Sequence, residues 1–395
     1  MSVIVVGAGV AGTAAALAAA RAGARVTVID AGPGASALWT GGIDGEAAVT
    51  DEGRSIAAVL DVILGDCALV TTTGLRRAAR GRDAALLHTA ASPVGVVRCD
   101  RPGWDADLVA RAAGEPFIAL EATVLRHTDE RVLPDADFAA RHDDEARLGW
   151  LAERLREGLA ASGRVQSLLL PPSLGIERAR AIALSKLVGM PCGEAAAMPG
   201  GPAGLRFERA RDRALGSASV TVVRGQALAV ERAGARWRVK VDGPDMDGDA
   251  LVVAAGGLVG GGLEYQPSEA MLAAALPPSA RLAFRCTLSG PLPLGAHGRP
   301  LELPGSLFGV PPESLAWPLS RDGGATMDRV GVLCDEHGRV APGLYVAGEL
   351  VADAPRTWLH ALASGAHAGA SATRDVVRAP GARPASAGEV PASRP

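Results

Sequence analysis

Three glycines near the N-terminus are spaced so that they could hold a phosphate group. Gly7, Gly9 and Gly12 form a G-x-G-x-x-G turn directly after the apolar residues 2–6. Glycines let the backbone approach a pyrophosphate closely, and a following helix points its free N–H groups at the phosphates. Asp30 comes about 20 residues later, where an acid is expected to bind ribose hydroxyls. We therefore expect a dinucleotide site made of Gly7, Ala8, Gly9, Val10, Ala11, Gly12 and Asp30.

The type of dinucleotide follows from this acid and from two later segments. An acidic residue at position 30 favours FAD or NAD over a cofactor with a 2′-phosphate. Gly348 and Glu349 follow a short apolar run, as in a second flavin-contacting strand, although an ordinary buried strand with a turn is the alternative. Ala255 and Gly256 fit a small-residue crossover that touches FAD. The order of these signals along the chain favours FAD over a simple NAD dehydrogenase.

Alternating strands and helices must position these residues. Strands expected over residues 2–6 and 24–29 flank a helix over residues 13–22, and the alternative is a Rossmann-like fold that has lost its ligand. Short alternating patterns over residues 217–254 predict a β-meander. We predict an α/β protein with a Rossmann-like FAD/NAD(P)-binding fold. Its parts are a discontinuous FAD-binding domain (1–45, 216–258 and 330–378), an inserted substrate or partner domain (46–215 and 259–329) and a disordered tail (379–395).

The inserted domain is expected to alternate strands with amphipathic helices. Residues 36–45 between the two domains show no periodicity, so we expect a loop that touches the ligand through Thr40, Gly41 and Gly42. The helices are expected over residues 105–113, 145–161 and 203–214, and the strands over residues 95–98, 117–121 and 167–170.

Composition limits the classes of partner. The 40 basic and 43 acidic side chains leave a formal charge of −3 without a long basic run, so nucleic acid is not expected. The 5 cysteines are far apart and form no C-x-x-C pair, so we expect no metal centre in this chain. Residues 3–20 lack charge but are mostly Ala and Gly without preceding basic residues, so no membrane span is expected. Scattered cysteines without a secretion signal favour the cytoplasm.

Six motifs stand out along the chain, and those after the first are of moderate specificity. They are the Gly7 turn, Thr40-Gly41-Gly42-Ile43-Asp44, Leu169-Leu170-Pro171-Pro172-Ser173-Leu174-Gly175, Gly189-Met190-Pro191-Cys192 to Arg206, Gly256-Gly257-Leu258-Val259-Gly260-Gly261-Gly262-Leu263, and residues 343–348. They occur in the same order in the anaerobic glycerol-3-phosphate dehydrogenase B-subunit family, which the chain resembles over most of its length.

The resemblance implies a flavin subunit of a respiratory dehydrogenase. In such an enzyme this subunit forms a flavin-containing dimer with a catalytic flavoprotein subunit, and the dimer docks on an iron-sulfur subunit located at the membrane. The reaction oxidises sn-glycerol 3-phosphate to dihydroxyacetone phosphate and passes the electrons to quinone. FMN is the usual assignment for this family, whereas the glycine turn favours FAD, so FMN is the alternative cofactor. We expect a cytoplasmic protein that reaches the inner face of the cell membrane only through these partners.

A site for glycerol 3-phosphate needs a cation for the phosphate and a base for the hydroxyl proton. Arg356 and His360 follow the second flavin motif and could supply both, although a surface arginine and a hydrogen-bonded histidine are the commoner fates of such residues. Weaker candidates are Arg285, His297 and His367, and Asp44 and Glu46 could face the flavin.

The chain departs from the family pattern directly after Gly348. A Gly-Gly pair and a glycine-rich run are expected there, but residues 351–360 carry larger side chains, which puts the substrate in doubt. Two other functions therefore stay open. One is another FAD-dependent oxidoreductase of the fumarate-reductase-like kind that acts on a small acid or amine. The other is a non-catalytic subunit that relays electrons or provides a scaffold for the catalytic flavoprotein.

Overall fold

Apolar residues at the N-terminus place the first strand in the middle of a sheet. The computed structural model describes residues 1–89, 93–162, 165–257, 259–267, 283–289, 301–306 and 331–378. All residues of β1 (Ser2–Val6) are buried, because β1 lies between two parallel neighbours, β2 (Arg25–Asp30) and β14 (Ala250–Val253). The sheet has the order β10-β2-β1-β14-β19-β18, and only β18 runs antiparallel to its neighbour. Its remaining strands are β10 (Thr221–Arg224), β18 (Arg339–Ala341) and β19 (Leu344–Val346).

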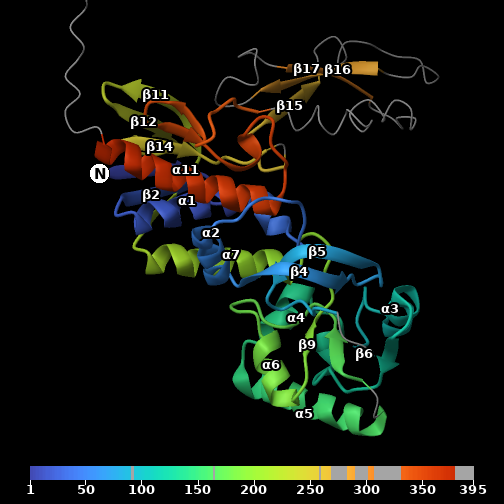
Figure 1. Cartoon of the computed structure of the whole chain (residues 1–395). Helices are drawn as coiled ribbons and strands as arrows, with labels where there is room; N and C mark the ends of the chain where they lie inside the picture. Colours follow the sequence, from blue (N-terminus) through green and yellow to red (C-terminus); the bar gives the residue numbers. More distant parts are fainter. Residues whose placement is uncertain are drawn as a thin grey trace, which may run out of the picture.

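Successive residues of β1 face two different layers. Val3 and Val5 belong to a hydrophobic core that includes helix α1 (Val10–Arg21). Ile4 and Val6 belong to a second core on the opposite face of the sheet, which a β-meander covers. The sheet therefore has helices on one face and strands on the other (Figure 1). We call this sheet with its two covering layers the first unit.

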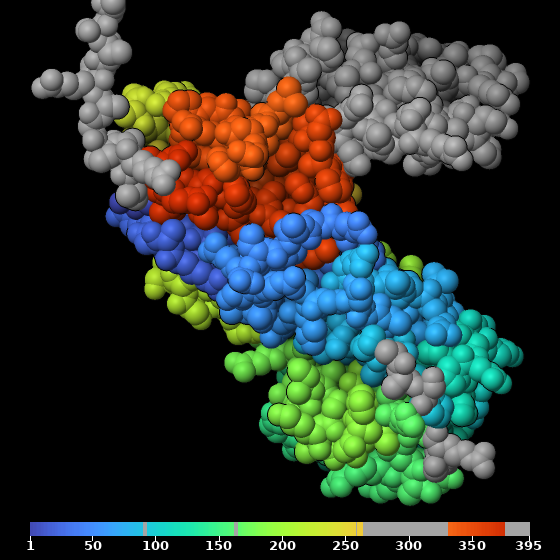
Figure 2. All heavy atoms as spheres, viewed as in Figure 1, coloured from blue at the N-terminus to red at the C-terminus, as the bar shows by residue number. Residues whose placement is uncertain are grey.

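The two helices that cover the sheet lie against each other with small residues between them. α11 (Trp358–Arg378) crosses α1, and a Cβ atom on Gly365 would lie 2.1 Å from the carbonyl oxygen of Ala11. A Cβ atom on Gly369 would lie 2.1 Å from the carbonyl oxygen of Ala15. Only glycine fits at such a close backbone approach. In Figure 2, α11 therefore lies directly on the N-terminal residues from which most of the chain separates it.

The β-meander is shorter than the sequence predicts. It contains β11 (Ala227–Ala233), β12 (Arg236–Val241) and β13 (Met246–Gly248), which pair in that order in antiparallel fashion. The two ends of the segment predicted as a meander (residues 217–254) instead form β10 and β14, which pair with β2 and β1 in the main sheet. Their apolar patterns are compatible with either pairing, because only contacts distant in sequence distinguish them.

The second unit is built around a four-stranded parallel sheet of order β7-β6-β8-β9. Its core is separate from the cores of the first unit. The helices expected over residues 105–113 and 145–161 are present as α3 and α5. The strands are β6 (Val94–Val97), β7 (Phe117–Leu120), β8 (Ser167–Leu170) and β9 (Cys192–Glu194). The helices are α3 (Ala106–Ala113), η2 (Thr128–Arg131), α4 (Asp135–Arg141), α5 (Glu145–Ser162) and α6 (Ala181–Val188).

A small antiparallel sheet lies between the two units (Figure 1). It contains β3 (Gly42–Ile43), β4 (Val62–Val70) and β5 (Arg76–Asp83) in the order β3-β5-β4. The sequence predicts none of these strands, since β4 and β5 are interrupted by Gly65 and by charged residues.

Two helices expected in the inserted domain pack on the first unit instead. α2 (Asp51–Val59) and α7 (Pro202–Ser217) fall within the expected inserted domain of residues 46–215. Their apolar residues Ile56 and Phe207 instead belong to the core of the first unit. Helical periodicity shows that a helix has an apolar face but does not show which core buries that face.

The segment of residues 259–329 is described only in part. It contains β15 (Glu264–Pro267), β16 (Ala283–Ser289) and β17 (Leu301–Ser306), which form an antiparallel sheet of their own. The expected tail, residues 379–395, lies outside the described residues.

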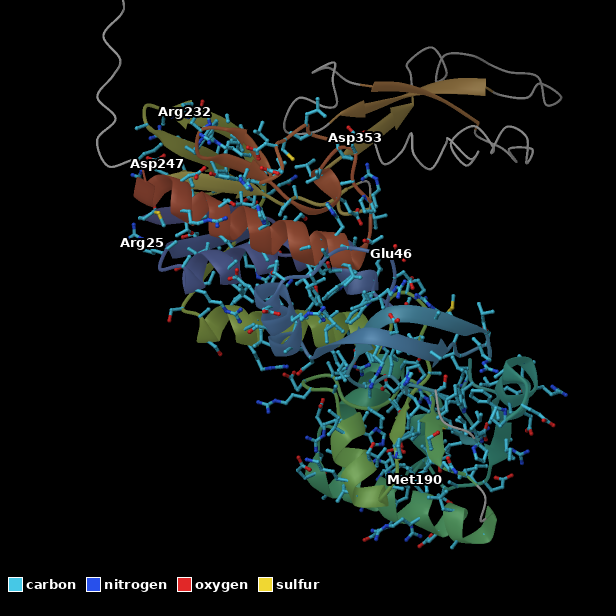
Figure 3. The ribbon with its side chains drawn as sticks, in the orientation of Figure 1. Arg25, Glu46, Met190, Arg232, Asp247 and Asp353 are labelled. Atoms are coloured by element: carbon cyan, nitrogen blue, oxygen red, sulfur yellow. The ribbon has the colours of Figure 1, made fainter. Side chains whose placement is uncertain are left out.

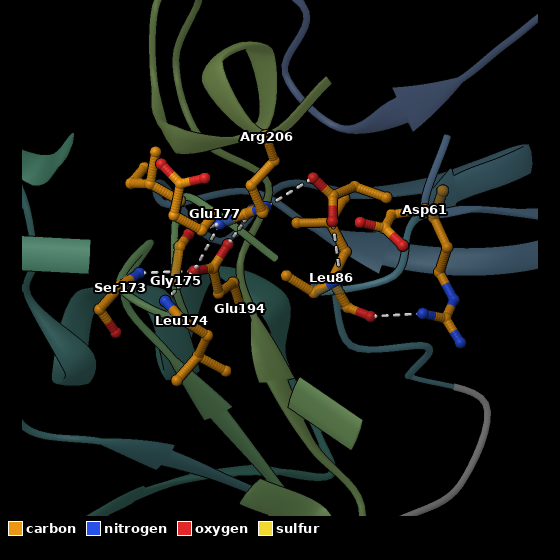
Figure 4. Close-up of polar contacts among 12 residues, drawn as sticks. Asp61, Leu86, Ser173, Leu174, Gly175, Glu177, Glu194 and Arg206 are labelled. Carbon is orange, nitrogen blue, oxygen red and sulfur yellow. Dashed lines mark hydrogen bonds and ion pairs between the residues drawn. The ribbon is translucent and has the colours of Figure 1, made fainter. Parts of the chain in front are cut away.

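A buried arginine ties α7 to the second unit (Figure 4). The Nε atom of Arg206 lies 2.9 Å from Asp83 Oδ2, and its Nη2 atom lies 2.6 Å from Glu194 Oε2. Its Nη1 atom donates to the carbonyl of Gly175 at 2.7 Å, and Glu194 accepts the Ser173 N–H at 2.6 Å. Burial raises the pKa of the Glu194 carboxyl, and the Arg206 charge opposes this rise. Arg206 thus holds two buried carboxylates and one loop in a single network.

Candidate functional site

A cavity of about 430 Å³ opens where β1, β2 and β14 end. Val6, Asp30 and Ala254 line it from these three strands, and Gly348 lines it after β19. Ligands of open parallel sheets bind outside the carboxyl ends of the strands. The position and the size of the cavity therefore fit a site for a dinucleotide.

The glycine turn forms one wall of this cavity. Gly7 adopts a φ of +99°, and a Cβ atom there would lie 2.3 Å from the carbonyl oxygen of Ala254. A Cβ atom on Gly12 would lie 1.8 Å from the carbonyl oxygen of Gly7, so α1 can approach the turn only without a side chain. Gly9 precedes α1 and supplies no side-chain cap. The first N–H groups of α1, which lack helical partners, are thus held beside the cavity at Val10 and Ala11.

Asp30 lies at the other end of this wall. Its side chain is buried, and its Oδ1 atom accepts the N–H of Gly32 at 2.9 Å. Its Oδ2 atom forms an ion pair with the largely exposed Arg224 and lies 3.8 Å from Nη2 of Arg211. A carboxylate oxygen accepts more than one hydrogen bond, so Asp30 retains capacity for ribose hydroxyls.

The two later motifs complete the cavity. Ala255 and Gly256 line it after β14, and Gly348 and Glu349 line it after β19. Gly348 has a φ of +74°, and its N–H donates to the hydroxyl of Ser364 on α11 at 3.0 Å. The structure therefore brings the first turn, the crossover and the second flavin motif together around one space.

Thr40, Gly41 and Gly42 do not line this cavity. Gly41 instead packs against the side chain of Leu86, and its carbonyl accepts the N–H of Asp83 at 2.7 Å. The neighbouring residues of the same loop, Ala35–Leu38 and the following Trp39, do line the cavity.

Aromatic side chains form part of the wall, and no motif in the sequence predicts them. Trp39 stacks on Trp358 with ring centroids 5.7 Å apart and meets Phe207 edge-on at 6.4 Å. Trp39 Nε1 donates to the carbonyl of Gly42 at 2.8 Å. Trp358 Nε1 is buried and has no hydrogen-bond partner among the described residues. A donor of this kind at the cavity wall is available to a bound ligand.

Two polar residues of the cavity also went unpredicted. Ser36 Oγ accepts the N–H of Val10 at 3.2 Å, so the short helix η1 (Ala35–Leu38) reaches the start of α1. Arg211 on α7 lines the same wall. No sequence motif identifies Ser36 or Arg211, because their positions in the cavity depend on how η1 and α7 pack.

The predicted catalytic pair lies outside the cavity lining. Arg356 reaches its edge, where Nη1 donates to the carbonyl of Glu349 at 2.8 Å. His360 is not among the lining residues, and its Nε2 atom is buried without a hydrogen-bond partner among the described residues. Burial lowers the pKa of His360 below its ordinary value of 6.5, so its ring is neutral at pH 7.

Of the weaker candidates, His367 lies apart from this site. His367 contacts His337, with Nε2 and Nδ1 separated by 2.8 Å, in an exposed pair. Burial is the main cause that lowers the pKa of His367, with the neighbouring His337 adding to it. The side chain of Arg285 and the whole of His297 lie outside the described residues.

A second, shallower cavity of about 470 Å³ lies beside the first. We call it the arginine cavity, because Arg54 and Arg80 line it together with Glu46 and Asp66. Arg80 already pairs with Glu46 and Asp66, each at 2.8 Å. Arg54 has no ion pair with any residue that the structure describes. Figure 3 shows Glu46 on the side of the first unit that faces the second unit.

The two cavities are separated by one close contact. Gly45 lines the arginine cavity, and Thr357 lines the first cavity. A Cβ atom on Gly45 would lie 2.5 Å from Cγ2 of Thr357, so these residues touch. Asp44, which we considered as a flavin-facing acid, instead pairs with Arg77.

Neither a metal site nor a membrane span is present in the part of the chain that the structure describes. Within the described ranges, no group of three or more His, Cys, Asp or Glu side chains is arranged to hold a metal ion. None of the helices in those ranges has the length and apolarity needed to cross a membrane.

Residues 2–63 match the family model of the FAD binding domain. FAD is the cofactor of this chain. The matched segment carries the glycine turn and Asp30, which line the cavity and are the residues predicted to hold the ADP half of FAD. FMN lacks that half, so it would leave this wall without a ligand. The chain is thus a flavoprotein with a Rossmann-like FAD-binding fold, as the sequence predicts.

Other comparisons add little detail. No curated protein matches the chain. Similar solved structures include an oxidoreductase from Agrobacterium tumefaciens, which is 11% identical over 95% of this chain and 98% of that chain, with a TM-score of 0.36. A thioredoxin reductase from Gloeobacter violaceus is 12% identical over 97% of this chain and 96% of that chain, also with a TM-score of 0.36. Similarity at this level does not identify a substrate.

Proposed function

We propose that this flavoprotein is an oxidoreductase that oxidises sn-glycerol 3-phosphate to dihydroxyacetone phosphate. The observation that carries this proposal is the arginine cavity, which lies one side-chain contact away from the FAD cavity. FAD held in the first cavity would supply the hydride acceptor that this oxidation needs. The remaining requirements, an anion site and a base, fall to the residues of the chain.

The anion site is assigned to Arg54. It is an exposed residue of α2, lines the arginine cavity and forms no ion pair with described residues, so its charge is available to a phosphate. Arg80 differs, because Glu46 and Asp66 already neutralise it. Its role is to hold the loop of Glu46 against β4 and so keep the cavity open.

The base is assigned to His360. His360 itself lines neither cavity, but its neighbour Leu359 lines the arginine cavity, and Thr357, three positions earlier, lies between that cavity and the FAD cavity. A neutral imidazole whose Nε2 atom has no described partner can accept the proton of the substrate hydroxyl. Arg356 would position the backbone of Glu349 through its hydrogen bond rather than contact the phosphate.

The partners follow from the family resemblance alone. We propose that the chain works beside a catalytic flavoprotein and an iron-sulfur protein that anchors the complex, and that electrons pass through them to quinone. Contact with the membrane would then be indirect. Co-expression with candidate partners followed by affinity purification tests this assembly, and a chain that always purifies alone argues against it.

An absorbance spectrum with substrate titration tests the proposed reaction. The purified protein should release FAD on denaturation, and anaerobic glycerol 3-phosphate should bleach the flavin band. Glycerol without phosphate is the matched control, since it offers the same hydroxyl without the anion. Bound FAD that glycerol 3-phosphate does not bleach would refute this substrate.

One observation favours a second function, that of a protein that relays electrons without binding substrate. Trp358, which lies in the segment where the family pattern predicts glycines, stacks on Trp39 in the cavity wall, and this pair would limit access to a bound flavin. Such a protein would bind FAD and exchange electrons with chemical reductants but would not be reduced by glycerol 3-phosphate.

A further inference from the structure

Arg211 is a buried cation in the wall of the FAD cavity. It lies on α7, and its side chain is only 6% exposed. Its Nη1 atom donates to the carbonyl of Ala8, within the glycine turn, at 3.4 Å. Its Nη2 atom lies 3.8 Å from Oδ2 of Asp30. The guanidinium therefore lies between the phosphate-binding turn and the ribose-binding acid.

The contacts of Arg211 leave part of its guanidinium free. Nε donates to Asp212 Oδ1 at 2.9 Å, and Nη2 lies 2.8 Å from the same oxygen. With the long bond to Ala8, these contacts engage at most three of the five N–H groups of an arginine. Asp212 is 45% exposed, so solvent screens the charge of this partner.

A buried guanidinium with unused donors is costly unless a ligand completes its contacts. The turn beside it and the first N–H groups of α1 form a site for an anion. We propose that Arg211 binds the diphosphate of FAD and that α7 thereby contributes directly to cofactor binding. The planar fork of an arginine suits the oxygen atoms of a diphosphate better than a lysine ammonium.

The competing explanation is that Arg211 only neutralises Asp30. The two roles predict that removing the Arg211 charge weakens binding of different parts of the cofactor. A diphosphate ligand loses affinity when the charge is removed, whereas adenosine carries the ribose that Asp30 binds but has no phosphate. Comparing ADP with adenosine therefore separates the two roles without any measurement of activity.

The experiment measures displacement of FAD from the full-length protein by ADP and by adenosine, in wild type and in Arg211→Gln. We expect the variant to bind ADP and FAD about 10- to 100-fold more weakly, the range for one hydrogen bond to a charged group. Adenosine affinity should change less than about twofold. Raising the salt concentration should weaken FAD binding more in the wild type than in the variant.

Arg209→Gln is the matched control, because Arg209 lies on the same helix but is 56% exposed and pairs with Glu177 at 3.2 Å. It should leave both affinities unchanged. If Arg211→Gln does not fold, Arg211→Lys replaces it, with a smaller selective loss of ADP affinity expected. Unchanged ADP affinity, an equal loss for adenosine or an equal loss in the control would each overturn the proposal.

Discussion

The two cavities of this chain are lined by different types of residue. Most residues that line the FAD cavity are glycines and alanines at the ends of strands and in the turns of the Rossmann-like fold. Side chains from α2, β4, β5, α11 and the loop of Glu46 form the arginine cavity, and four of them carry charge. A site formed by glycine turns can be recognised from a motif in the sequence. A site formed by long side chains cannot, because it depends on how elements distant in the sequence pack.

This difference has a functional consequence. The FAD cavity must match one invariant ligand, so its geometry is fixed by positions where a single methyl group would collide with the backbone. The arginine cavity can change its specificity by exchanging surface residues without disturbing the fold. Substitutions at the two sites should therefore affect different measurements, and the following predictions range from the largest expected effect to the smallest.

Gly12→Ala should cause the largest loss. Its Cβ atom would lie 1.8 Å from the carbonyl oxygen of Gly7, so either α1 or the turn must move. We expect a destabilisation of about 3 kcal/mol, at the upper end for overpacking, together with loss of bound FAD. Urea unfolding and the flavin-to-protein absorbance ratio measure the two effects.

Gly216→Ala is the control for this change. Gly216 lies in α7, and a Cβ atom there would meet nothing within 4 Å. Alanine has the higher helix propensity, so this variant should be stabilised by up to about 1 kcal/mol. Equal behaviour of the two variants would show that close packing at the turn is not what fixes the FAD cavity.

His360→Gln should lower the rate of flavin reduction by glycerol 3-phosphate about 100-fold, the lower end for loss of a general base. Glutamine keeps the size of the side chain but cannot accept the proton. FAD content should stay the same, since His360 does not line the FAD cavity. An unchanged rate would remove His360 from the mechanism.

The pH dependence of the wild type gives an independent check on His360. The base acts when neutral, and burial lowers its pKa below 6.5. Reduction should therefore be constant above pH 6.5 and fall as the pH drops through the lowered pKa. Stopped-flow reduction between pH 5 and pH 8, run at about half-unit intervals, measures the profile. A fall that begins above pH 7 would assign the titration to another group.

Asp30→Asn should weaken FAD binding by about 2 kcal/mol, within the range for hydrogen bonds to a charged group. The amide keeps one acceptor oxygen but loses the charge that pairs with Arg224. Fluorescence titration of the apoprotein with FAD and, separately, with FMN measures the effect. FMN has no adenosine ribose, so equal losses for the two flavins would contradict the placement of Asp30.

The sequence predicts the FAD end of the molecule because short-range patterns determine it. The βαβ unit, the order of the three flavin motifs and their lining residues can be deduced from strand periodicity and glycine spacing. The exception is the loop of Thr40, Gly41 and Gly42, whose glycines serve packing against Leu86 and Leu69 rather than ligand contact. A glycine pattern alone does not distinguish these two uses.

The other residues of the two sites depend on contacts between distant segments. Arg211 and Phe207 enter the FAD cavity because α7 packs on the first unit, although the sequence of α7 only shows that it is a helix. Trp39 and Trp358 meet although most of the chain separates them. The sheet of β4 and β5 is interrupted by glycine and charge, so no alternation predicts it.

Arg54→Gln should have the smallest effect and the most specific one. Removing a solvent-exposed cation from a phosphate site should raise the KM for glycerol 3-phosphate about 10-fold, or about 1.4 kcal/mol, while FAD content and stability stay the same. Arg25→Gln is the matched control, because Arg25 is also exposed and lies at the opposite end of the main sheet (Figure 3). A raised KM in both variants would indicate a general effect of net charge. An unchanged KM in both would mean that the arginine cavity is not the substrate site, and the contrast between the two cavities would then reflect the fold rather than the reaction.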